Sequence, residues 1–274
     1  MRMASEFVAS DALPESVTVH VGDVESLLGW ADHASHVSTV VIAPVELHRR
    51  NLKLRLTDAN LPLDAFAFAG PTVVASNVLE TAGKSSKALD RVDRLALLGD
   101  ILSGENEATE RFRLVFGGEP AQSGDDVEQA RRELEVATNY HPVRMHAFRQ
   151  AVESTPSPID VDAGDLLDVT LAVERALRRR SEKSPSDGAL IRRATRTVID
   201  TDGSAWDEAY PSAERIALVG LSTVPATLVD LFNAIMSRCD VEAHLYLRRG
   251  TGPFLEQRLA DVWSVPNPGQ VVVT

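Results

Sequence analysis

The sequence lacks several features that would narrow its function at once. It has one cysteine, Cys239, so we expect neither an internal disulfide nor a metal site built from several cysteines. No apolar run reaches the ~18–20 residues that cross a bilayer. The first residues include Glu6 and Asp11 but no long apolar core, which a secretory signal peptide would need. We therefore expect a soluble cytoplasmic protein that does not bind a membrane.

Lysine is scarce, whereas acidic residues are in excess. The chain has 4 Lys beside 24 Arg, and its formal net charge is −12 at pH 7. Few lysines, many acids and few aromatic residues are typical of salt-accumulating archaea, in which an acidic surface keeps proteins soluble. A bacterium with a GC-rich genome, in which arginine also replaces lysine, is the alternative. In either case the acidity does not argue against nucleic-acid binding.

The most informative stretch that is present runs from residue 38 to residue 56. Residues 38–43 form an apolar, β-branched run that stops at Pro44, and residues 45–57 have the apolar spacing of an amphipathic helix. An alternating run at 17–21 predicts an earlier strand, followed by a short helix over 23–33. Such strand–helix pairs are the building blocks of parallel α/β sheets.

The following segments extend this pattern on both sides of a long helical block. Residues 66–68 and then 71–75 predict extended pieces, and a helix is expected to begin at Ser76. From residue 87 to residue 200 apolar residues recur at helical spacing. The α/β pattern then returns, with strands predicted at 216–220, 241–247 and 270–273 and helices at 225–238 and 254–262. We therefore expect an α/β domain, 1–86 plus 201–274, interrupted by a helical subdomain, 87–200.

The chemistry of nucleotide binding is missing from the expected places. A phosphate-binding loop needs glycines, a lysine and a Ser or Thr after the first strand. Here Asp23 and Glu25 follow that strand, without a lysine. No acid that could hold magnesium ends the strand at 216–220. Asp200 and Asp202 follow an apolar pair, and we interpret them as part of a turn rather than as metal ligands.

The histidines and the cysteine do not form a recognisable site either. His33 and His36 are spaced like two ligands on a helix, with His20 or His48 as a third. No acid or cysteine completes a known spacing, so surface histidines are the preferred interpretation. Cys239 ends an apolar helix and fits a small core residue. We expect no cofactor and no metal.

One basic region stands out in the acidic chain. Residues 174–196 carry eight basic and three acidic side chains, a local charge of +5. Helical spacing places its arginines on neighbouring positions of two successive helices. They fit contacts with a phosphate backbone, and the alternative is a solvated face that pairs with acids elsewhere. The candidate nucleic-acid-binding residues are Arg175, Arg178, Arg179, Arg192, Arg193 and Arg196.

The order of these segments resembles a known family of helicases. The stretch 38–56 resembles the segment of superfamily 1 helicases in which an apolar strand leads into a helix ending in Arg-x-Leu. Residues 70–76 look like the element that follows, and residues 217–225 look like the strand after the helical insertion. The chain looks closest to the AddB/RexB type of helicase-nuclease subunit, although Leu221 replaces the aromatic residue that often follows Gly220 there.

This resemblance implies a parallel RecA-like (P-loop NTPase-like) α/β sheet, interrupted by a mostly α-helical inserted subdomain. The lysine and the acid of the family's ATPase site have no matching residue, so the resemblance does not carry ATP hydrolysis to this chain. It implies a non-catalytic helicase-like protein of DNA repair or recombination, which binds DNA or scaffolds a nuclease or helicase partner. A protein-interaction adaptor that binds no nucleic acid, and a small-molecule enzyme on a Rossmann-like sheet, are the alternatives.

Overall fold

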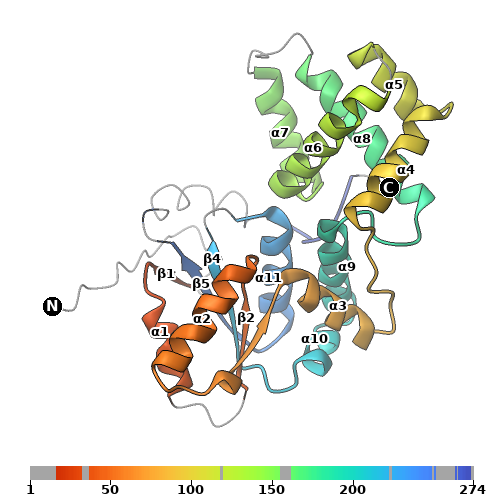
Figure 1. Ribbon diagram of the computed structural model, residues 1–274. Coiled ribbons are helices and arrows are strands. Elements are labelled where there is room, and N and C mark those ends of the chain that lie inside the picture. The colour runs from red at the N-terminus through yellow and green to blue at the C-terminus, as the bar shows by residue number, and fades with distance from the viewer. Residues whose placement is uncertain are drawn as a thin grey trace.

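An α/β domain and a lobe of helices make up the computed structural model of the chain (Figure 1). The structure describes residues 17–32, 37–117, 120–154, 162–221, 224–248, 250, 263 and 265–272. The elements of the α/β domain are β1 (Val17–Val21), α1 (Glu25–Ala31), β2 (Thr39–Ile42), α2 (Glu46–Asp58), a 3-10 turn (Leu63–Ala65), β3 (Phe66–Ala69), α3 (Pro71–Thr81), α9 (Asp187–Asp200), α10 (Ser204–Ala209), β4 (Arg215–Leu221), α11 (Ala226–Arg238) and β5 (Glu242–Leu247). The helical lobe consists of α4 (Arg91–Ser103), α5 (Glu107–Phe116), α6 (Pro120–Thr138), α7 (Pro142–Ser154) and α8 (Ala163–Arg180).

The five strands form one sheet in the order β1-β5-β4-β2-β3. Each neighbouring pair is parallel; β4 is the central strand, and the interior strand β2 pairs with both β3 and β4. Parallel strands need a crossover connection, usually a helix, and the longest one here carries the whole helical lobe between β3 and β4. The predicted α/β fold, with a parallel RecA-like sheet and a mostly helical insertion, is confirmed.

Alternate side chains of the strands pack against two layers of helices. On one face, Val41 and Ala217 contact the apolar sides of α1 and α2 through residues such as Leu27 and Leu56. On the other face, apolar side chains of β2, β4 and β5 pack against α3, α9, α10 and α11. Because side chains alternate along a strand, the burial of all four β2 residues shows that both faces of this strand are covered.

The helical lobe has its own apolar core. Leu98, Phe112 and Val173, from α4, α5 and α8, belong to one buried cluster, and a smaller one joins α6, α7 and α8. Helix α9 lies within the expected inserted subdomain, 87–200, but its apolar face packs in the cluster beneath the sheet. The segments that join the lobe to the domain are therefore the chain before α4 and the chain between α8 and α9.

The prediction of an extended segment at 71–75 is wrong, because these residues form the first half of α3. Gly70 is extended and Pro71 occupies the first helical turn, where a missing N–H costs nothing and the fixed φ suits a helix. Val74 and Val78 are fully buried one turn apart. Packing against the sheet therefore outweighs the β propensity of the Thr-Val-Val run.

The strand expected at 270–273 is also wrong for the residues that the structure describes. Residues 270–272 contain no strand. The Val272 N–H donates to the Tyr140 carbonyl at 3.0 Å, and Val271 packs beside the small cluster of the helical lobe. This segment therefore contacts the lobe instead of extending the sheet. The helix expected at 254–262 lies outside the described residues.

Candidate nucleic-acid interface

The connections that leave the sheet diverge at the carboxyl end of β2. The chain leaves β2 toward α2 on one face, but it leaves β3 and β4 toward α3 and α11 on the other face. β2 lies between β3 and β4 in the sheet. In open parallel sheets ligands bind outside the carboxyl ends of the strands, where the connections change direction. The topology alone therefore indicates a ligand site at this edge of the sheet.

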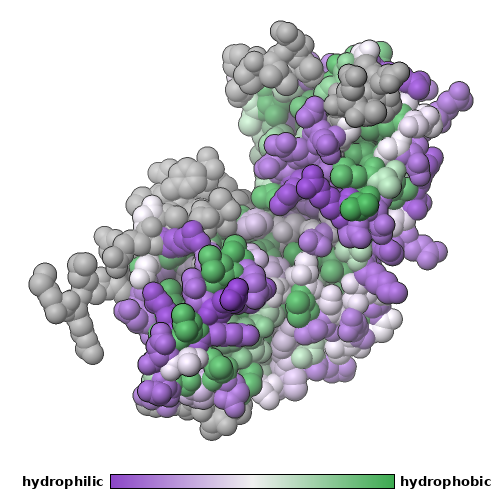
Figure 2. All heavy atoms as spheres, in the orientation of Figure 1, coloured by the Kyte–Doolittle hydropathy of each residue, from purple (hydrophilic) through white to green (hydrophobic). Residues whose placement is uncertain are grey.

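A cleft of about 590 Å³ lies at this edge, between the domain and the helical lobe. From the domain its lining includes Pro44, Arg49, Gly70, Pro71, Pro225, Thr227 and the start of α9, Ser186, Asp187 and Gly188. From the lobe its lining includes Arg91, Arg94, Arg131, Arg132 and Glu135. Figure 2 shows hydrophilic side chains gathered at the base of the lobe, where it approaches the domain.

The lining of the cleft is positively charged, although the whole chain is strongly acidic. Five arginines line it against Glu135 and Asp187, which leaves a local charge of +3 in a chain of −12. Arg91 and Arg132 are exposed and form no ion pair with any residue that the structure describes. Their guanidinium groups are available to a ligand from solution.

Two helices also begin at the cleft. Helices α3 and α11 start after Gly70 and Pro225, and neither has a side-chain hydrogen bond that caps its first turn. The first N–H groups of a helix have no partner within it, and the helix dipole adds positive potential there. The Arg49 guanidinium lies against Gly70, where a Cβ would come within 2.9 Å of Nη1; it donates to the Ala43 carbonyl at 2.6 Å and forms an ion pair with Glu46. The two uncapped helix starts favour an anionic ligand.

Behind the exposed arginines lies a buried ionic network that joins the lobe to α9. The Glu174 carboxylate is fully buried and accepts from Arg131 at 2.9 Å and from Arg178 at 2.7 Å. Arg192 of α9 lies 3.9 Å from the same carboxylate. Burial alone would raise the pKa of Glu174, but Arg131, Arg178 and Arg192 hold this pKa below its ordinary value. The carboxylate is therefore charged at neutral pH.

The structure separates the arginines expected to form one nucleic-acid-binding face. Arg178 and Arg192 meet inside the protein, where both contact Glu174 and lie 5.6 and 5.5 Å from the Tyr140 ring. Arg192 is buried, whereas Arg179 and Arg196 are exposed on different helices. Arg175 is partly exposed and lies 4.0 Å from Glu107, and Arg193 donates to Ser184 at 3.0 Å. Only Arg179 and Arg196 present an exposed guanidinium without a described ion pair.

Sequence reasoning missed the arginines of the cleft. Arg49, Arg91, Arg94, Arg131 and Arg132 come from α2, α4 and α6, which are far apart along the chain. No local window therefore shows their combined charge. The available signals were the Arg131-Arg132 pair, within a helix that also carries several acids, and the Arg49-Arg50 pair of α2.

A family model described as Halobacterial UvrD-like protein matches residues 3–274. The chain belongs to this family. A comparison with curated proteins gave no match. The family supports both the helicase relationship and the salt-adapted origin expected from the acidic, lysine-poor composition.

The segment that follows β1 of this UvrD-like chain carries two acidic side chains. The Asp23 carboxylate accepts from the Ser26 N–H at 3.2 Å, and Glu25 lies in the first turn of α1. A carboxylate here occupies the place at a helix start that a phosphate would need. Two negative charges therefore lie at the start of α1.

The other candidates considered from the sequence of the UvrD-like chain take simple structural roles. Asp202 and Gly203 have positive φ values of 48° and 89°, and they form the expected turn after α9. Burial raises the pKa of the Cys239 thiol to about 12, so this thiol is unreactive at neutral pH.

His33 and His36 lie outside the described residues. Among the described residues no group of three or more His, Cys, Asp or Glu could hold a metal ion. No described helix is long and apolar enough to cross a membrane.

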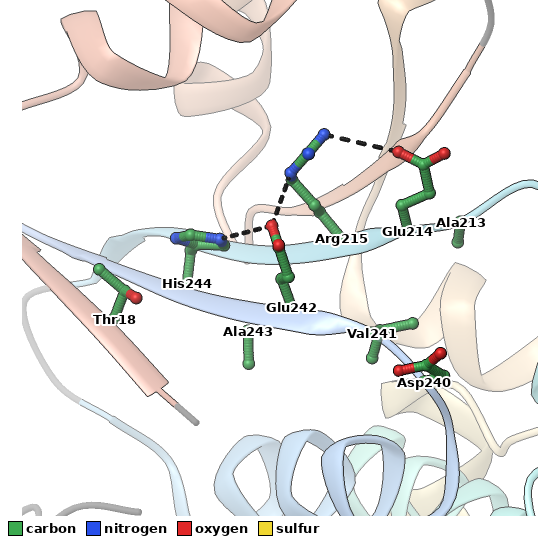
Figure 3. Close-up of a pocket in the computed structure, with 9 residues that line it drawn as sticks. All are labelled: Thr18, Ala213, Glu214, Arg215, Asp240, Val241, Glu242, Ala243 and His244. Atoms are coloured by element: carbon green, nitrogen blue, oxygen red, sulfur yellow. Dashed lines mark hydrogen bonds and ion pairs between the residues drawn. The ribbon is translucent and has the colours of Figure 1, made fainter. Parts of the chain in front are cut away.

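A pair of histidines links β1 to β5 on the face of the sheet that α1 covers. His20 Nε2 lies 3.2 Å from His244 Nδ1, and the Tyr246 ring stacks on His20 with the centroids 4.3 Å apart. The other nitrogen of His244 faces Glu242, which also binds Arg215 (Figure 3). Burial, together with the neighbouring His20, lowers the pKa of His244 to about 4, and burial also lowers the pKa of His20. Both rings are therefore neutral at pH 7.

The histidine pair makes the stability of the UvrD-like chain depend on pH. A histidine whose pKa is lowered by folding contributes stability above its unfolded pKa of about 6.5, and this stability is lost as the pH falls toward the folded pKa. We expect Tm to be constant from pH 8 to about 7 and to fall between about 6.5 and 4. Replacing His244 by Gln should flatten this fall, whereas replacing the exposed His146 by Gln should leave it unchanged. Thermal unfolding at fixed KCl checks this, and an equal pH dependence in all three proteins would contradict it.

Proposed function

We propose that this UvrD-like chain is a non-catalytic helicase-related protein, which binds the phosphate backbone of DNA in the cleft and presents it to a separate nuclease or helicase subunit in repair or recombination. The observation that carries the proposal is the cleft itself. It combines exposed Arg91 and Arg132 with two uncapped helix starts at the carboxyl edge of the sheet. Guanidinium groups and helix N-termini are the groups with which proteins bind phosphates.

The loop after β1 supports the non-catalytic half of the proposal. A nucleotide-hydrolysing site of this kind places a lysine near the β and γ phosphates. In this chain Asp23 and Glu25 stand there instead, and the Asp23 carboxylate accepts from the Ser26 N–H in the first turn of α1. This loop therefore supports the proposal of a helicase-related chain that does not hydrolyse nucleotides.

The expected loss of DNA affinity at high salt supports the other part of the proposal, that the chain acts together with a partner subunit. A single strand that makes four phosphate contacts loses roughly 10³-fold in affinity for each tenfold rise in salt, because log K falls with a slope of about −0.7 per contact. In molar salt the cleft alone holds DNA weakly. A partner subunit that binds the same strand would raise the local DNA concentration and restore tight binding.

The test is a charge reversal in the cleft. We expect Arg91→Glu with Arg132→Glu to lower the affinity for labelled DNA by about 10²-fold, since each lost charge-assisted hydrogen bond contributes about 1.5 kcal/mol. The salt slope should also become shallower by about 1.4. Fluorescence anisotropy in a KCl series, with single-stranded and duplex oligonucleotides, measures both quantities.

The matched control reverses two exposed arginines away from the cleft, Arg55 and Arg113. It changes the net charge by the same amount, so any larger effect of the cleft variant is local. Equal affinities for the two variants would refute the cleft as the DNA site. If the wild-type chain shows no salt-sensitive DNA binding, the protein-interaction adaptor replaces the present proposal.

A further inference from the structure

The cleft contains a carboxylate of the chain itself at a position built for an anion. Glu135 of α6 reaches across to the start of α9, where its Oε1 accepts from Ser186 Oγ at 2.8 Å and from Arg192 Nη2 at 3.3 Å. Arg131 Nη1 lies 3.9 Å from Oε2. The Glu135 side chain is only 6% exposed, so these contacts surround it on most sides.

Gly188 makes room for this carboxylate. A Cβ at position 188 would lie 2.5 Å from the carboxyl carbon of Glu135 and 2.8 Å from both of its oxygens, so only glycine permits this approach. Gly188 is the second residue of α9, and the N–H groups of the first turn have no partner within the helix. The carboxylate is thus held by two guanidinium groups and by the Ser186 hydroxyl, which itself caps α9 by accepting from the Ala189 N–H at 3.0 Å.

These donors suit a phosphate as well as a carboxylate. Arginine forks, a hydroxyl and helix N–H groups are the usual partners of phosphate oxygens, and a phosphate offers more oxygens than a carboxylate. The surrounding network holds four arginines, Arg94, Arg131, Arg178 and Arg192, and three glutamates, Glu128, Glu135 and Glu174. A phosphodiester carries one negative charge and could replace the Glu135 carboxylate without changing this balance.

We infer that Glu135 occupies a phosphate-binding position of the cleft and competes with the phosphate of the ligand for it. The inference rests on the proposed function, because it concerns the same cleft. Binding of a strand then moves the Glu135 carboxylate away from Ser186 and Arg192 and places a backbone phosphate there. The competition lowers the affinity of the wild-type chain for any strand that does not fill this position.

Glutamate-to-glutamine variants at two neighbouring positions test the competition. Glu135→Gln removes the competing charge, and Glu133→Gln removes the same charge from an exposed position two residues earlier on α6. We expect Glu135→Gln to bind a labelled single strand about tenfold more tightly than the wild type, with a salt slope steeper by about 0.7. Glu133→Gln should stay within about twofold of the wild type. Equal affinities of the two variants, or weaker binding by Glu135→Gln, overturn the inference.

Inorganic phosphate provides a test that does not depend on DNA binding. With Glu135→Ala the position is vacant, so phosphate should raise Tm relative to KCl of equal ionic strength, as any ligand of the native state does. The wild type and Glu133→Ala should show a smaller rise, from the exposed arginines and uncapped helix starts of the cleft alone, and an equal rise in all three proteins would refute this inference. If Glu135→Ala does not unfold cooperatively, Glu135→Gln carries the measurement. A wild type that binds no DNA refutes the proposed function alone, whereas the absence of a phosphate effect in the Glu135 variant refutes this inference.

Discussion

Replacing Glu174 by Leu is expected to lower the free energy of unfolding by about 3–5 kcal/mol, the usual cost of removing one partner from a buried ion pair. The carboxylate is 0% exposed and lies within 4 Å of three arginines, Arg131, Arg178 and Arg192. Arg131 itself is 1% exposed, so without Glu174 its charge would remain buried with Glu128 as the main counter-ion. Leucine fills the volume but leaves the buried arginines with one counter-charge fewer.

Urea unfolding at constant KCl, followed by circular dichroism, measures the effect of Glu174→Leu. The control is Glu182→Leu, the same substitution at an exposed position after α8, which should change the free energy by less than about 0.5 kcal/mol. A loss at Glu174 as small as that at Glu182 would mean that the arginines find other partners or water. The network would then not hold the lobe in place.

Replacing Asp230 by Ala is expected to have an effect of similar size, about 3–5 kcal/mol. Asp230 of α11 is fully buried and accepts from Arg144 at 2.8 Å and from Asn139 at 2.5 Å. The Gly269 N–H also points to it at 3.4 Å. One carboxylate of the α/β domain therefore holds the turn between α6 and α7 and the segment near the C-terminal end of the described chain.

Because Asp230 joins the two parts, its loss should also reduce their cooperativity. We expect hydrogen exchange to accelerate in α6 and α7 before it does so in the sheet, since subglobal opening follows the weakest contacts. The control is Glu208→Ala, which removes an exposed acid of α10. Uniform acceleration over the whole chain, or none, would contradict a specific role of Asp230 as the anchor of the lobe.

Most of the fold could be predicted from the sequence, because its signals are local. Each element is indicated by its own residues: the β-branched run at 39–42 indicates β2, the proline at 44 its end, and the leucine spacing that follows indicates α2. The extended interpretation of 71–75 failed where tertiary burial overrode propensity. The strand expected at 270–273 failed because Val271 and Val272 contact the helical lobe rather than a strand.

The candidate site was less accessible to sequence reasoning, for a physical reason. Its arginines come from three helices that only the fold brings together, so the charge of the cleft is invisible in any single window. The basic stretch 174–196 was visible, but Arg178 and Arg192 belong to a buried network because Glu174 and Glu135 lie beside them. A count of charges along the chain cannot distinguish an internal ion pair from an exposed contact.

The order of the strands in the sheet also determines the order in which the protein can fold during synthesis. Thr39 of β2 pairs with Phe66 of β3 only 27 residues later, but it pairs with Arg215 of β4 176 residues later. A ribosome that adds about 5–20 residues per second needs roughly 10–35 s to make that intervening chain. The helical lobe, whose core residues all lie between β3 and β4 in the sequence, can form in this interval. The nascent chain meanwhile exposes one edge of the interior strand β2, and this edge is protected from aggregation only when β4 is synthesised and pairs with it.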